Sequence, residues 1–168
     1  FGPKNRQDYF IRLGAAFDSV ADGLQYAHSK GIIHRDIKPS NLILDQRSKV
    51  WVTDFGLARI ASDPGISMTG DIVGTLRYMS PEQALAKRVL VDHRTDVYSL
   101  CATLYELLTL EPVFRGHDRQ EVIKRIAFDE PRGLRKLNKA IPAELETIVL
   151  KGLEKNPDRR YATAKEVA

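Results

Sequence analysis

The sequence predicts a mainly α-helical domain, a helical bundle that contains one small β-hairpin. Two observations predict the bundle: apolar residues recur at helical spacing from Gln7 to Ser29, and a second, more apolar helical segment runs from Thr95 to Thr109. A third predicts the hairpin, because two short apolar runs are separated by a polar turn. The 168 residues are 43% hydrophobic and 29% charged, which suits one domain with a buried core.

The first half of the chain is expected to form a long helix followed by the hairpin. The apolar side of the helix is Phe10, Leu13, Phe17, Val20, Leu24 and Ala27. Gly31 supplies a stop signal. The strands are expected over 42–44 and 50–52, joined by the turn 45–48. From about 58 to 81 the periodicity is lost, and a loop of this length is either functional or disordered.

The second half is expected to be helical. Residues 95–109 are the most apolar segment and are expected to form a buried central helix. Amphipathic patterns predict further helices over 118–127 and 142–154. A last helix is expected to start near Thr163.

Composition excludes several classes of protein. The net charge is +4, and the basic residues are scattered among 22 acidic ones, so a nucleic-acid-binding tail is not expected. The single cysteine, Cys101, allows no internal disulfide and suits a reducing, cytoplasmic compartment. No apolar stretch reaches the length that a bilayer requires. The chain starts at Phe1, so we expect it to be cut from a longer protein, which could carry a membrane anchor.

Three polar motifs lie where a packed core does not require polar residues. His34–Asn41 (HRDIKPSN) lies between the first helix and the hairpin, Asp54-Phe55-Gly56 follows the second strand, and Ser80-Pro81-Glu82 closes the long loop. Their order and context resemble the eukaryotic-type serine/threonine protein kinase family. The amino-acid sequence of residues 79–83 and 96–109 is similar to that of the bacterial members of this family. The sequence departs from the family pattern with Ser80 for alanine and Cys101 for glycine.

The resemblance covers essentially the whole chain and implies roles for the catalytic loop. Asp36 would be the base for a substrate hydroxyl, and Lys38 would place a positive charge on the γ-phosphate of ATP. Asn41 and Asp54 would supply oxygen ligands to Mg²⁺. Ile43 would form the floor under the adenine.

The resemblance also implies the class of substrate and a means of regulation. Lys38 favours serine and threonine over tyrosine, and Thr75 would contact both the catalytic base and this lysine. Arg35 would pair with a phosphorylated residue of the long loop, for which Thr69 and Ser67 are the candidates. The alternative is that these two are merely solvated loop residues.

Other matches imply structural roles. Asp96 would hydrogen-bond the backbone of the catalytic loop, and Glu82 would form a buried ion pair with Arg160. His34 and Phe55 would belong to a hydrophobic stack that aligns active kinases. Gly56 permits a backbone turn that a side chain would hinder.

The resemblance identifies residues 1–168 as the C-terminal lobe of a kinase catalytic domain, truncated at both ends. No Gly-x-Gly-x-x-Gly precedes the catalytic loop, so the N-terminal β lobe is expected to be absent and to be a partner supplied by the longer protein. ATP, Mg²⁺ and a protein substrate are implied, although we expect the fragment alone to be inactive. The alternative is a pseudokinase or scaffold that binds partners without catalysis. Asp36, Asn41 and Asp54 are all present, which favours the enzyme.

Overall fold

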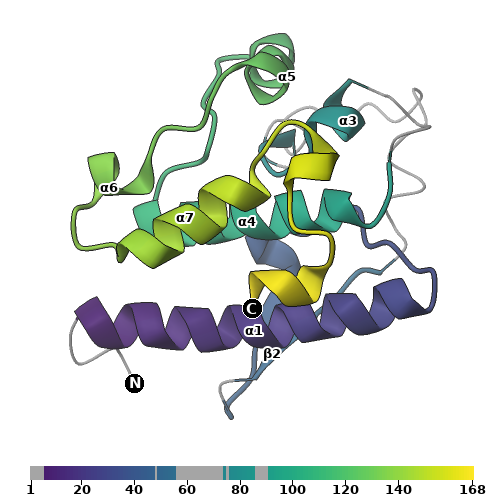
Figure 1. The fold of residues 1–168 in the computed structure, drawn as a ribbon, viewed down its shortest axis with the longest axis vertical. Coiled ribbons are helices and arrows are strands. Elements are labelled where there is room, and N and C mark those ends of the chain that lie inside the picture. The colour runs from purple at the N-terminus through teal and green to yellow at the C-terminus, as the bar shows by residue number, and fades with distance from the viewer. Residues whose placement is uncertain (1–5, 48, 56–73, 75, 86–90) are drawn as a thin grey trace.

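The computed structural model describes residues 6–47, 49–55, 74, 76–85 and 91–168. Helix α1 (Arg6–Ser29) leads through the 3-10 turn η1 (Pro39–Asn41) into strands β1 (Leu42–Leu44) and β2 (Val50–Val52). The later elements are α3 (Pro81–Ala84), α4 (Arg94–Thr109), α5 (Arg119–Phe128), α6 (Leu134–Leu137), α7 (Ala143–Gly152), η4 (Pro157–Arg159) and η5 (Ala164–Val167). Figure 1 shows α1 running roughly alongside α4 and α7, with α5 set apart from them.

The long elements predicted from the sequence are confirmed. The structure contains the first helix, the central helix and both amphipathic helices, with ends within about two residues of the expected ones. The hairpin is antiparallel, with Ile43 opposite Trp51. The C-terminal helix expected from Thr163 is instead a single 3-10 segment, η5. The one-turn helices α3 and α6 were not predicted, because a single turn is too short to show helical periodicity.

Helix α4 is the centre of the hydrophobic core. Most of its side chains are buried, and it contacts α1, α6, α7 and η5. Helix α1 contributes Phe17, Val20 and Leu24 to the same core. The start of α4 contacts the segment that connects α1 to the hairpin.

None of the described helices combines the length and the apolar character that spanning a membrane requires.

Candidate active site

The catalytic loop is anchored by Asp96, which is fully buried in the first turn of α4. Its carboxylate accepts hydrogen bonds from the backbone N–H groups of His34 (2.8 Å) and Arg35 (2.7 Å). It also lies 2.7 Å from Nε2 of His28, near the end of α1. A buried carboxylate needs such partners, and here they fix the loop to two helices at once.

His34 joins the catalytic loop to the end of β2. Its Nδ1 accepts from the backbone N–H of Asp36 at 3.2 Å, which leaves Nε2 to donate to the carbonyl of Thr53 at 2.7 Å. The ring is buried and makes an edge contact with Phe55, with 4.6 Å between centroids. The side chain is thus held in one tautomer and one orientation.

Asp36, Lys38 and Asn41 form one connected cluster. Nζ of Lys38 lies 2.9 Å from Oδ2 of Asp36. Nδ2 of Asn41 donates to the carbonyl of Asp36 at 2.8 Å and to its Oδ2 at 3.1 Å. Both carboxylate contacts fix the direction in which Asp36 presents its second oxygen. The cluster therefore places the Asp36 carboxylate, which can accept a proton, beside the ammonium group of Lys38.

The chemistry of Asn41 and Asp54 fits a magnesium ion. Because the Asn41 amide uses its nitrogen toward Asp36, its oxygen remains for a hard cation. Asp54 lies two residues after the end of β2, is exposed, and has a left-handed φ of 62°. Aspartate tolerates this conformation better than most residues, and unusual backbone angles cluster at functional sites. The described ranges contain no group of three or more His, Cys, Asp or Glu side chains that could hold a metal. In proteins, Mg²⁺ is usually bound by one or two carboxylates together with substrate phosphates and water.

Arg35, which directly precedes Asp36, has two unusual features. Its φ is 68°, a left-handed value that is uncommon for a residue with a long side chain. Its Nε is buried with no hydrogen-bond partner in the part of the chain that the structure describes. A buried donor without an acceptor is costly, so this group is suited to an incoming anion.

Glu82 and Arg160 form a buried, two-pronged ion pair. Nη1 and Nη2 of Arg160 each donate to one oxygen of Glu82 at 2.8 Å. Arg160 also donates to the carbonyls of Arg94, Glu154 and Lys155, which satisfies its remaining donors. The pair ties α3 to the segment around η4.

Sequence reasoning missed two residues that hold the loop. Gln83 forms a capping box with Ser80 and donates from Nε2 to the carbonyl of Arg35 at 2.9 Å. The Ser-x-x-Gln spacing is a known signal for such a box and could have revealed it. The contact of His28 with Asp96 had no signal in a single sequence, because it depends on how α1 packs on α4.

The remaining predicted residues are Ile43, Gly56, Ser67, Thr69 and Thr75. Ile43 lies half-exposed on the hairpin. Gly56, Ser67, Thr69 and Thr75 lie outside the described residues. The expectations for these four therefore stay predictions.

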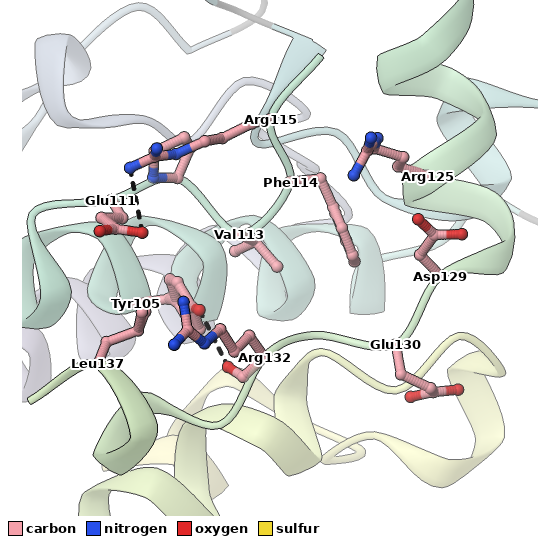
Figure 2. Close-up of a pocket in the computed structure, with 11 residues that line it drawn as sticks. Tyr105, Glu111, Val113, Phe114, Arg115, Arg125, Asp129, Glu130, Arg132 and Leu137 are labelled. Atoms are coloured by element: carbon pink, nitrogen blue, oxygen red, sulfur yellow. Dashed lines mark hydrogen bonds and ion pairs between the residues drawn. The ribbon is translucent and has the colours of Figure 1, made fainter.

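A surface hollow of about 270 Å³ lies well apart in the fold, beside the C-terminal end of α4 and below α5. Figure 2 shows Val113 and Phe114 on its wall among charged side chains of both signs. The Tyr105 hydroxyl donates to the carbonyl of Arg132 at 2.9 Å within it. None of the predicted site residues that the structure describes lines this hollow, so it is separate from the catalytic loop.

Comparison with known proteins identifies the family of the chain. The family model "Protein kinase domain" matches residues 11–168. The chain is 42% identical over 157 residues to serine/threonine-protein kinase PknB of Mycolicibacterium smegmatis, covering 90% of this chain and 25% of that protein. It is 43% identical over 150 residues to the probable serine/threonine-protein kinase SCO3848 of Streptomyces coelicolor, covering 88% of this chain and 22% of that protein.

A third relative gives the same result: the chain is 40% identical over 148 residues to the probable serine/threonine-protein kinase CPE1738 of Clostridium perfringens, covering 88% of this chain and 21% of that protein. The chain thus spans about a quarter of the length of these relatives. The matched region contains the whole cluster around Asp36 together with its anchor, Asp96. The chain therefore belongs to the protein kinase family, and it is similar to bacterial serine/threonine-protein kinases.

Proposed function

We propose that this chain is the C-terminal lobe of a kinase that transfers the γ-phosphate of ATP to serine and threonine hydroxyls of protein substrates. One observation carries the proposal. The Asp36 carboxylate is held between Lys38 and Asn41, on a loop whose backbone is anchored by the buried Asp96. Phosphoryl transfer needs little more from a protein than positioning and charge neutralisation, and this cluster supplies both.

Each residue has a defined part in this proposal. Asp36 accepts a hydrogen bond from the substrate hydroxyl and takes its proton. Lys38, already paired with Asp36, supplies a positive charge to phosphate oxygens. Asn41 and Asp54 hold Mg²⁺, which when bound neutralises charge on the phosphates. Ile43 supports the adenine from the exposed side of the hairpin.

The rest of the ATP site is proposed to come from an N-terminal lobe elsewhere in the longer protein. That lobe would contribute a glycine-rich loop over the phosphates and a lysine paired with a glutamate. The catalytic machinery would lie on the cytoplasmic side, where ATP is available. The unpaired Nε of Arg35 supports a further part of the proposal, that phosphorylated Thr69 or Ser67 binds Arg35 and orders the long loop.

The test compares the longer protein with its Asp36→Asn variant in an ATP-dependent phosphorylation assay. We expect kcat to fall about 10²- to 10⁴-fold, because the amide cannot accept the proton, while the variant remains folded. Asp18→Asn, which neutralises an exposed carboxylate on α1, is the matched control and should leave kcat unchanged. Phosphopeptide mapping of the ATP-treated wild type should find Thr69 or Ser67 modified.

Two results would contradict the proposal. Full turnover by Asp36→Asn would show that this residue is not the base. Absence of turnover in a wild-type protein that still binds partner proteins would favour the scaffold alternative.

A further inference from the structure

The β-hairpin has one face that does not pack on the core. Leu42, Val50 and Val52 pack against the core cluster, whereas Ile43 and Trp51 are 53% and 51% exposed. Ile43 and Trp51 are directly opposite each other in the register. Side chains of a strand alternate between faces and cross-strand pairs share one, so these two lie side by side on the far face. We call this pair the outer hairpin face.

Trp51 is fixed in place although it is exposed. Its indole Nε1 donates to Oδ2 of Asp45 at 2.9 Å, and Nζ of Lys49 lies 4.4 Å from the ring centroid. Asp45 is itself held by the backbone N–H groups of Arg47 and Lys49. The hydrogen bond from Trp51 lowers the pKa of the Asp45 carboxyl, which keeps this acceptor charged. An aromatic ring held in this way is a preformed binding surface, because little side-chain entropy remains to be lost.

The outer hairpin face continues toward the proposed metal site. The backbone N–H of Thr53 donates to the carbonyl of Asn41 at 3.0 Å, which extends the ladder to a pair two positions beyond Ile43 and Trp51. Two residues of strand span about 7 Å. Figure 1 shows the opposite end of the hairpin, its turn, projecting beyond α1. An apolar surface thus lies beside the phosphate-binding end, as a nucleotide with its base on the hairpin requires.

We propose that Trp51 contacts the nucleobase, so that the purine of ATP packs against Trp51 as well as Ile43. This inference rests on the proposed function, and it adds a second, aromatic contact to the aliphatic one. Because the Lys49 ammonium lies over one face of the indole, a planar base would stack on the other face. Stacking of this kind is worth a few-fold to about a hundredfold in affinity per base. A purine presents more ring surface than a pyrimidine, so the pair favours purine nucleotides.

The test measures ADP–Mg²⁺ binding to the longer protein by calorimetry and by tryptophan fluorescence. Trp51 is the single tryptophan of the 168 residues, and Trp51→Phe separates its signal from any other tryptophan in the longer protein. We expect ADP to change the fluorescence of the wild type and this change to be lost in Trp51→Phe. Trp51→Ala should raise the Kd for ADP roughly fivefold or more, since it removes the stacking surface.

The matched control is Leu44→Ala. Leu44 is 64% exposed on the same hairpin, but it pairs with Val50 on the other face. We expect its Kd for ADP to stay within about twofold of the wild-type value. Circular dichroism of each variant shows whether a change in Kd reflects lost folding.

Each further outcome decides the inference. If ADP binds the wild type and a folded Trp51→Ala variant equally, or if Trp51 fluorescence does not respond to bound ADP, Trp51 is no base contact and the proposed function still stands. A blue-shifted, unresponsive emission without nucleotide would mean that protein covers the face, which also overturns the inference. If calorimetry detects no binding of ADP or ATP to any variant, the proposed function fails as well.

Discussion

Cys101, which departs from the family pattern, packs so closely on α7 that the facing position there has no room for a side chain. The residue is fully buried in α4, and burial raises the pKa of its thiol to about 12. The thiol therefore stays protonated and unreactive at neutral pH. Its sulfur lies directly against the backbone of Gly152, the last residue of α7, where an added Cβ would overlap it. The close approach of α4 and α7 depends on this pair.

Gly152→Ala is expected to destabilise the domain by about 1–3 kcal/mol, because the new methyl group meets the Cys101 side chain in a packed core. The measurement is the free energy of unfolding in urea. The double variant Cys101→Gly/Gly152→Ala should be less destabilised than the sum of the two single variants, since the clash has been removed. Gly23→Ala, at a helical glycine with open space around it, is the control and should stabilise by about 0.5–1 kcal/mol. Equal effects of the two alanine substitutions would contradict the packing argument.

Among the elements, α5 buries Val122 and Ile126 in the core and contacts α3, and a lysine holds its C-terminal end. Nζ of Lys155 donates to the carbonyl of Ile126 in the last turn of α5 at 2.7 Å. The same ammonium lies 4.2 Å from the centroid of the Phe114 ring. Burial lowers the pKa of Lys155 to about 8, although Glu130 and Asp129 oppose the shift. The end of α5 is therefore held by a group that loses its charge in mildly alkaline solution.

This depressed pKa predicts a pH dependence with a definite sign. Between about pH 8 and pH 10.5 the unfolded chain keeps the proton that folded Lys155 has released, so the contribution of this group to stability rises with pH. Urea unfolding of the wild type and Lys155→Met should show a difference in unfolding free energy that grows in favour of the wild type across this window. A difference that stays constant from pH 7 to pH 10 would contradict the assignment.

Elements also differ in how far the sequence could predict them. The long helices follow from a 3.6-residue apolar period, and the hairpin follows from two apolar runs around a polar turn. Helix α3 has only one turn, and it forms because Ser80 and Gln83 cap each other while Pro81 starts the turn. Helix α6 gets no cap from its own N-cap residue, Gly133, and is held by burial of Leu134 and by Glu146, which accepts from the backbone N–H of Arg135 at 2.8 Å. Such short elements depend on tertiary contacts that one sequence does not display.

The site shows the same division. Asp36, Lys38 and Asn41 are close in sequence, so their spacing within one short motif is enough to indicate that they lie near one another. The residues that hold them come from distant segments, such as Gln83, 48 positions from the carbonyl it binds. The place of Trp51 beside Ile43 depends on the register of the two strands, which the sequence pattern alone does not fix.

At the scale of the whole molecule, the pair between Glu82 and Arg160 joins segments that lie 78 residues apart. Both side chains are buried, and the guanidinium also lies over the ring of Tyr98, 5.0 Å from its centroid. Removing one partner would leave a buried charge without compensation. The pair therefore couples the end of the long loop to the last third of the chain.

Arg160→Met is expected to cost about 3–5 kcal/mol of unfolding free energy, because Glu82 keeps its charge without a partner. The double variant Glu82→Gln/Arg160→Met should recover part of this loss. Asp22→Asn breaks the exposed pair with Lys165 and should cost less than about 1 kcal/mol, which makes it the matched control. Similar losses of unfolding free energy from Arg160→Met and Asp22→Asn would show that the buried pair contributes no more to stability than the exposed pair.

The anchor at Asp96 also determines when the catalytic loop can form during protein synthesis. The carboxylate binds the N–H of Arg35 across 61 residues of sequence. At about 5–20 residues per second, a ribosome completes His34, Arg35 and Asp36 roughly 3–12 s before it adds Asp96. During that interval the loop lacks the acceptor for two of its backbone donors. A nascent chain released before α4 is made would therefore carry the full catalytic motif without its working geometry.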